Sequence, residues 1–85
     1  MKQRLTVLGS TGSIGTNTLD VVRRHRADYE IFALSAATQV DALLAQCAEF
    51  RPQYAVMASA AHALQLEEKI KENGLLTHVL HAKDA

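Results

Sequence analysis

Four short runs of apolar and β-branched residues alternate with three longer stretches in which apolar residues recur at helical spacing. The runs cover residues 4–8, 29–34, 54–57 and 78–80, and each has the length and residue types of a strand. The first run stops at Gly9, and we expect it to form a strand that is buried on both faces.

The stretches between these runs are expected to be helices, because their apolar residues recur three and four positions apart. The first two stripes consist of Ile14, Thr18, Val21, Val22 and His25, and of Val40, Leu43, Leu44, Cys47 and Phe50. Thr38 and Asp41 form an expected capping pair for the second helix, which Pro52 ends. Ser59 is the expected cap of the third helix, and Gly74 is its left-handed terminator.

The order of elements is β-α-β-α-β-α-β, which is typical of an α/β fold with a parallel sheet. Right-handed crossovers predict a three-layer Rossmann-like sheet covered by helices, of which this chain holds the first half only. In such a sheet the first strand lies at the centre, so here it would present an unpaired edge. We therefore expect residues 1–85 to be the N-terminal part of a dinucleotide-binding domain, from a longer polypeptide or from an oligomer that pairs this edge.

Three glycines punctuate the turn between the first strand and the first helix. Gly9, Gly12 and Gly15 form a G-x-x-G-x-x-G pattern, a looser form of the dinucleotide-binding G-x-G-x-x-G. They would permit a tight exit from the strand, close approach of a phosphate and close packing of the helix on the strand, respectively. Thr11 and Ser13 add hydroxyl donors, so we expect the turn to hold a pyrophosphate at the helix N-terminus. The alternative is an ordinary strand-to-helix turn whose glycines serve only its shape.

The residues after the second strand bear on the choice of cofactor. NAD sites place an acidic residue there for the ribose 2′-hydroxyl, and NADP sites place a basic residue near the 2′-phosphate. Residues 34–39 contain neither, and Glu30 lies at the wrong end of the strand. Without a repelling carboxylate, Thr38, Gln39 and the N–H groups of the second helix can donate to a 2′-phosphate. The sequence therefore favours NADP over NAD.

Charge and hydropathy exclude several other classes of protein. Nine Lys and Arg balance nine Asp and Glu, which leaves no basic excess to hold a nucleic acid or an anionic membrane. Arg23, Arg24 and Arg26 form the only basic cluster, which is typical of a helix end. The longest uncharged run, residues 31–40, is too short to span a membrane, and the chain opens without a signal-peptide pattern. A cytoplasmic location is expected.

Cysteine and histidine positions indicate no metal site and no nucleophile. Cys47 is the single cysteine, which excludes an internal disulfide and a cysteine-based zinc site. Its place on the second apolar stripe indicates a buried thiol. His25 is expected to cap the first helix at its C-terminus, while His78 and His81 flank the last strand with no carboxylate at metal-ligand spacing.

Residues 8–15, which read Leu-Gly-Ser-Thr-Gly-Ser-Ile-Gly, and residues 18–22, Thr-Leu-Asp-Val-Val, closely resemble the N-terminus of 1-deoxy-D-xylulose 5-phosphate reductoisomerases. The match continues through residues 32–34, 46–47 and 54–56, so the resemblance spans most of the chain. The glycine turn alone is also similar to that of aspartate-semialdehyde dehydrogenases and extended short-chain reductases. The segment at 18–22 separates the families.

The resemblance implies an NADPH-dependent oxidoreductase of the non-mevalonate isoprenoid route. Such an enzyme isomerises the sugar phosphate 1-deoxy-D-xylulose 5-phosphate and reduces the product by hydride transfer to 2-C-methyl-D-erythritol 4-phosphate. The resemblance also implies a soluble homodimer and a divalent metal, magnesium or manganese. The family's phosphate-binding residues fall on Thr11, Gly12, Ser13 and Ile14, and its adenosine-phosphate loop falls on Ala37, Thr38 and Gln39.

The chain departs from the family pattern at one position and covers only part of it. Many members have a lysine where this chain has Thr38, so a cation that would meet the 2′-phosphate is missing. The family's metal, substrate and catalytic residues lie later, so the catalytic and C-terminal domains are expected to be absent from this chain. Two alternatives stay open: a fragment of an aspartate-semialdehyde or short-chain dehydrogenase, and a non-catalytic nucleotide-sensing module.

Overall fold

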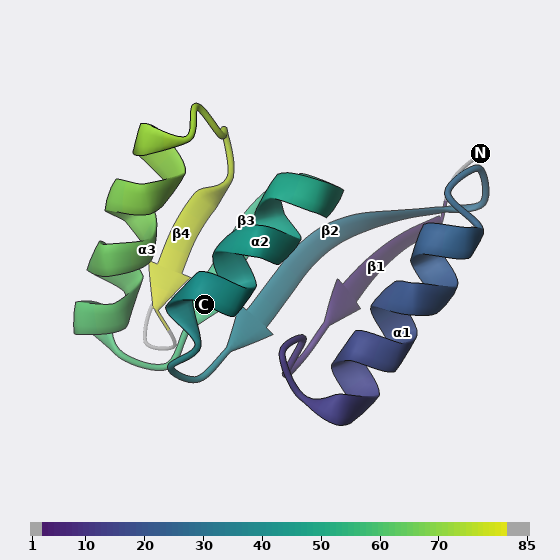
Figure 1. Ribbon diagram of the computed structural model, residues 1–85, viewed down its shortest axis with the longest axis horizontal. Coiled ribbons are helices and arrows are strands. Elements are labelled where there is room, and N and C mark those ends of the chain that lie inside the picture. The colour runs from purple at the N-terminus through teal and green to yellow at the C-terminus, as the bar shows by residue number, and fades with distance from the viewer. Residues whose placement is uncertain (1–2, 82–85) are drawn as a thin grey trace.

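The computed structural model describes residues 3–81, so the ends of the expected 1–85 segment lie outside the described residues. Strands and helices alternate strictly along the chain (Figure 1). In chain order they are β1 (Gln3–Val7), α1 (Ser13–Arg24), β2 (Tyr29–Ala36), α2 (Val40–Phe50), β3 (Tyr54–Met57), α3 (Ala60–Glu72) and β4 (His78–His81). The predicted order of elements is therefore confirmed.

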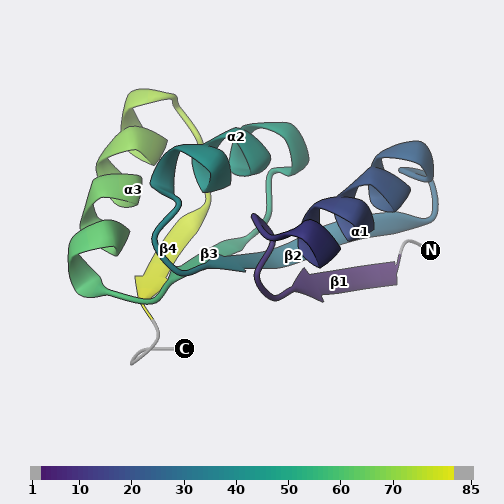
Figure 2. The same ribbon diagram turned by 60° about the horizontal axis from the view of Figure 1, so that its bottom comes forward.

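The strands form one parallel sheet in the order β1-β2-β3-β4. Each crossover steps in the same direction, so crossovers of one handedness place α1, α2 and α3 on the same face of the sheet. Figure 2 shows the three helices side by side over that face. The α/β half-fold is confirmed, and the described residues hold the sheet with one of the two helical layers of a three-layer fold.

The hydrophobic core lies between the sheet and this helical layer. Its fully buried large side chains are Leu19, Leu34, Leu43, Met57 and Leu66. The expected stripe of α2 is confirmed at Val40, Leu43 and Cys47, which are buried.

The expected stripe of α1 is wrong in its rotational phase. Ile14 is 83% exposed and Val21 is 52% exposed, whereas the buried positions of the helix are Gly15, Leu19 and Val22. The cause is the start of the helix, where the face of Gly15 packs against the preceding turn. This contact fixes the rotation of the helix and turns Ile14 toward solvent.

The expectation that the first strand is buried on both faces is also wrong. Only Val7 of β1 is buried, and Leu8 lies beyond the strand and is 79% exposed. β1 pairs with β2 alone, as expected for an edge of the half-sheet, and no helix of the described chain covers its second face.

The helix ends agree with the sequence analysis except at the start of α2. There the N-cap is Gln39, which makes no capping side-chain bond, so the predicted Thr38 and Asp41 pair is wrong. The main-chain oxygen of Thr38 instead accepts the Val40 N–H at 2.9 Å in a tight turn. The Ser59 hydroxyl accepts the backbone N–H of residue 62 at 3.2 Å, which confirms the cap of α3.

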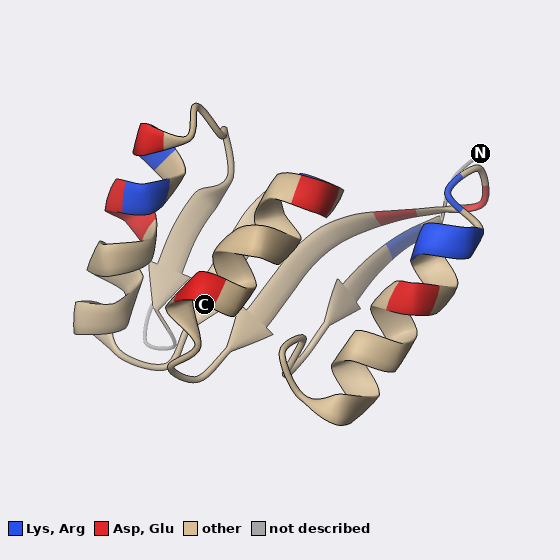
Figure 3. Cartoon of the chain, in the orientation of Figure 1, with Lys and Arg blue, Asp and Glu red and all other residues tan. Residues whose placement is uncertain are grey.

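The basic cluster is confirmed as a helix end that packs on its neighbours. Arg23 in the last turn of α1 and Arg26 just beyond the helix both bind Glu49 near the end of α2, with the Arg26 contact at 3.2 Å. Figure 3 shows basic positions at the end of α1 and an acidic position at the end of α2. Both guanidinium groups also lie over the ring of Phe50, at 5.4 and 5.2 Å from its centroid. The hydrogen bond from Arg23 lowers the pKa of Glu49. Arg24 pairs with Asp20 of its own helix at 3.1 Å.

Cys47 is fully buried on α2, and burial raises the pKa of its thiol to about 11. Since only the thiolate reacts, we expect alkylation of the folded protein at pH 8 to be at least about 100-fold slower than that of a free cysteine. Iodoacetamide labelling followed by mass spectrometry measures this rate. The same protein in urea provides the control, and equal rates in the two states would show that the thiol is accessible.

Candidate functional site

The turn between β1 and α1 leaves the sheet abruptly at its carboxyl edge. Gly9 has a φ of 64°, in the left-handed region that side chains other than glycine rarely adopt. The Gly12 N–H donates to the Gly9 carbonyl at 2.9 Å and closes the turn. The tight exit from the strand that was expected at Gly9 is confirmed.

The start of α1 packs directly against this turn at Gly15. A β-carbon at Gly15 would lie 2.3 Å from the carbonyl oxygen of Gly9 and 2.6 Å from the Cα of Ser10. Both distances are far below van der Waals contact, so only glycine fits. The close packing expected at Gly15 is confirmed, with the turn itself as the partner.

The N-terminus of α1 has free backbone donors. Its N-cap is Gly12, which has no side chain to cap the helix, and the first helical hydrogen bond runs from Thr16 N–H to the Gly12 carbonyl. The N–H groups of residues 13–15 therefore have no intrahelical partner. Residues 8–19 include no charged side chain, so the positive potential at this end comes from the backbone. Such an arrangement favours an anion.

The end of β2 anchors the turn through Ser35. The N–H and the hydroxyl of Ser10, which is fully buried, donate to the main-chain oxygen of Ser35 at 2.7 and 3.2 Å. The Ser35 hydroxyl accepts the Gly9 N–H at 3.0 Å. A third anchor comes from α2, where Gln46 Nε2 donates to the Ser10 carbonyl at 2.8 Å. Sequence reasoning missed the roles of these three residues, since no local pattern marks them.

A groove of about 350 Å³ lies at the carboxyl ends of β1, β2 and β3, beside the turn. It is lined by Leu8, Gly9, Ser35, Ala36, Ala37, Val56, Met57 and Ala58. Of the predicted site residues, the structure brings Gly9 and Ala37 together on this groove. Open α/β sheets bind their ligands at this edge.

The other predicted site residues flank the groove on two helix starts. Thr11, Gly12, Ser13 and Ile14 lie in the turn and the first residues of α1. Thr38 and Gln39 are exposed between β2 and α2, and neither makes a side-chain hydrogen bond to another described residue. The eight predicted residues therefore line one edge of the sheet.

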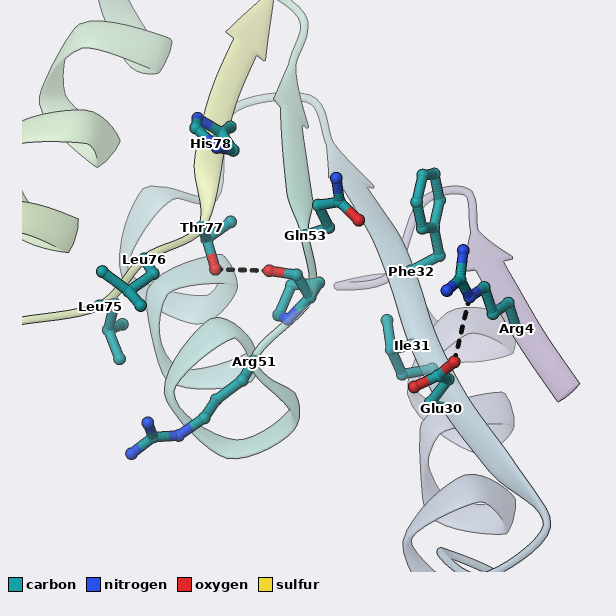
Figure 4. A pocket seen from close by; sticks show the side chains of 11 residues that line it. Arg4, Glu30, Ile31, Phe32, Arg51, Gln53, Leu75, Leu76, Thr77 and His78 are labelled. Carbon is teal, nitrogen blue, oxygen red and sulfur yellow. Dashed lines mark hydrogen bonds and ion pairs between the residues drawn. The ribbon is translucent and has the colours of Figure 1, made fainter. Parts of the chain in front are cut away.

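A second hollow of about 400 Å³ lies at the amino ends of the strands, opposite to the glycine turn. Figure 4 shows Arg4 and Glu30 facing each other on one side of it, joined by an ion pair of 3.1 Å. The Thr77 hydroxyl donates to the main-chain oxygen of Pro52 at 2.8 Å across its floor. Arg4 and Glu30 thus bind each other, and Arg51 also lines the hollow. Ligands of parallel sheets bind at the other edge.

Within residues 3–81 there is no group of three or more His, Cys, Asp or Glu side chains that could hold a metal ion. No helix in the same range is long and apolar enough to cross a bilayer. The chemistry that these residues support is the binding of an anionic group by backbone donors.

Replacing Gly15 by alanine tests the contact between α1 and the turn. We expect Gly15→Ala to lower the free energy of unfolding by about 3 kcal/mol, because the backbone atoms it meets cannot move aside cheaply. Gly12→Ala is the matched control: its β-carbon lies 3.3 Å from the Gly9 oxygen at a φ of −83°. It should cost less than about 1 kcal/mol. Urea unfolding measures both, and equal losses would contradict the packing.

Comparisons with known proteins agree with this geometry. The family model of 1-deoxy-D-xylulose 5-phosphate reductoisomerase matches residues 5–85. A reductoisomerase of Cupriavidus metallidurans is 54% identical over 83 residues, which cover 98% of this chain and 21% of that protein. A reductoisomerase of Dechloromonas aromatica is 52% identical over 83 residues, which again cover 98% of this chain and 21% of that protein.

Solved structures of the same enzyme have this fold. DOX-P reductoisomerase in complex with NADPH, fosmidomycin and magnesium has a TM-score of 0.91 at 39% identity, covering 96% of this chain and 20% of that one. The Zymomonas mobilis enzyme in complex with NADPH has a TM-score of 0.90 at 31% identity, covering 99% and 22%. The chain thus spans about a fifth of the length of the relatives it matches. This chain belongs to the 1-deoxy-D-xylulose 5-phosphate reductoisomerase family.

Proposed function

We propose that residues 1–85 are the N-terminal part of the NADPH-binding domain of a reductoisomerase. The enzyme would convert 1-deoxy-D-xylulose 5-phosphate to 2-C-methyl-D-erythritol 4-phosphate, by isomerisation and then reduction, in isoprenoid precursor biosynthesis. Family membership supports this proposal, and so do the related enzymes that were solved with NADPH. NADPH supplies the hydride for the reduction.

The main support for the proposal is the start of α1, which has no capping side chain and packs closely against the glycine turn. Gly12 at the N-cap leaves the first N–H groups of α1 unpartnered, and no acidic residue lies in the first turn of the helix. A pyrophosphate at this position accepts hydrogen bonds from the backbone N–H groups and the side-chain hydroxyls of Thr11 and Ser13. Gly9 and Ile14 lie beside these two residues. The helix dipole adds to the attraction.

The loop after β2 is proposed to hold the adenosine 2′-phosphate. Ala37, Thr38 and Gln39 are exposed, and the N-terminus of α2 has no side-chain cap. Asp41 lies in the first turn of α2, but Lys69 Nζ is 3.6 Å from its carboxylate and offsets its charge. No acidic residue lies at the end of β2, where NAD sites place the carboxylate that would repel a 2′-phosphate, and Lys69 reduces the repulsion from Asp41.

The remaining parts of the reaction are assigned to other regions of the full-length enzyme. Residues 3–81 hold no metal-binding cluster, so the divalent metal, magnesium or manganese, is proposed to bind elsewhere in the polypeptide. The sugar-phosphate site and the catalytic groups belong there too. A homodimer in the cytoplasm is proposed on the resemblance to the family.

Titration of the full-length polypeptide with NADPH and NADH, followed by nicotinamide fluorescence, tests the cofactor assignment. We expect NADPH to bind more tightly than NADH, and equal affinities would contradict the NADP preference. Gly12→Val places a branched side chain against the pyrophosphate and should abolish binding of both in a folded protein. Unchanged binding would show that the phosphate lies elsewhere, and binding without turnover of the sugar phosphate would favour a nucleotide sensor.

Thr38→Lys tests the position of the 2′-phosphate. The added cation should strengthen NADPH binding by roughly tenfold and leave NADH binding unchanged, because only NADPH carries a phosphate there. Gln65→Lys adds the same charge to an exposed position of α3 and should change neither affinity. If both variants strengthened NADPH binding equally, the gain would come from net charge and the assignment of this loop would be wrong.

A further inference from the structure

We propose that Gln46 is a positioning residue for the pyrophosphate: it fixes the peptide group between Ser10 and Thr11 and so sets the direction of the Thr11 N–H. The inference rests on the proposed function, since it needs a phosphate group at the turn. Gln46 lies in the middle of α2, 36 residues along the chain from Ser10, and touches the turn from the helical layer.

All polar groups of Ser10 form hydrogen bonds, and their partners belong to two elements, β2 and α2. Its N–H and hydroxyl donate to the Ser35 main-chain oxygen at the end of β2, whereas its carbonyl accepts from Gln46 on α2. Ser10 is fully buried, so no water competes for these groups. The turn is therefore held from the sheet on one side and from α2 on the other.

The bond from Gln46 determines where the next backbone donor points. No peptide bond in the described chain is cis, and in a planar trans peptide the C=O and the following N–H point in opposite directions. Because the Ser10 carbonyl points at Gln46, the Thr11 N–H points away from α2. It has no backbone acceptor of its own and is left as a donor of the turn.

The amide of Gln46 contributes little to folding, which favours a role in geometry. Its Oε1 is buried and has no hydrogen-bond partner among residues 3–81. An unpaired buried acceptor costs free energy, and this cost offsets the gain from the bond that Nε2 makes. An apolar side chain of the same length removes this unpaired acceptor, but it leaves the buried Ser10 carbonyl without a donor. The fold then loses a modest part of its stability, and α2 no longer holds the peptide group between Ser10 and Thr11.

Gln46→Met in the full-length polypeptide tests this inference, because methionine keeps the length of the side chain and removes both amide groups. We expect the affinities for NADPH and NADH to fall together by roughly tenfold. The midpoint of thermal unfolding should fall by only a few degrees, so the variant stays folded at the temperature of the titration. Binding of adenosine 2′-monophosphate, which lacks a pyrophosphate, should not change. Gln65→Met makes the same replacement on the exposed face of α3 and should alter none of these values.

The outcomes separate the inference from the proposed function. If the wild type binds NADPH and the Gln46→Met variant binds it equally well, Gln46 has no positioning role and the cofactor assignment stands. Loss of adenosine 2′-monophosphate binding in parallel with NADPH would show a general structural effect and also overturn it. Wild type that binds no NADPH would overturn both. If Gln46→Met failed to fold, Gln46→Leu, which also removes the donor and adds no charge, should show the same loss of dinucleotide affinity.

Discussion

The contact between Gly15 and the turn before it is the constraint on which the site depends. Since the helix touches the carbonyl of Gly9 with no room for a β-carbon, α1 must begin at once and with a fixed rotation. That rotation buries Leu19 and Val22 and leaves Ile14 in solvent, while the free N–H groups lie at the start of the helix beside the glycine turn. The contact at Gly15 therefore determines both how α1 packs on the sheet and where its anion-binding N–H groups lie.

The two edges of the sheet differ in how their polar groups are satisfied. At the amino edge Arg4 binds Glu30, and the rings of Phe32 and Tyr54 pack edge to face. At the carboxyl edge the side chains are small or uncharged, and the backbone of α1 keeps unpaired donors. The unpaired backbone donors of α1 make the carboxyl edge the better site for a phosphate-bearing ligand, because parallel sheets bind their ligands at this edge.

Local signals predicted the fold well, and long-range contacts account for what they missed. The strand at Tyr54–Met57 and the Ser59 cap depend on neighbouring residues and were found from the sequence. The phase of α1 depends on a contact across the glycine turn, and hydropathy alone placed Ile14 on the wrong face. The Thr38 cap failed because a tight turn uses the main chain of that residue instead. Gln46 meets Ser10 across 36 positions, a pairing that no local pattern encodes.

Leu8 precedes the glycine turn, Ile14 lies in the first turn of α1, and both side chains are exposed, so this region presents apolar surface together with positive potential. These two attractions respond to different conditions. Added salt weakens the attraction between exposed donors and a phosphate, whereas cooling weakens the burial of apolar surface. A ligand that binds the backbone donors and also covers this apolar surface would therefore keep part of its affinity when either the salt concentration or the temperature changes.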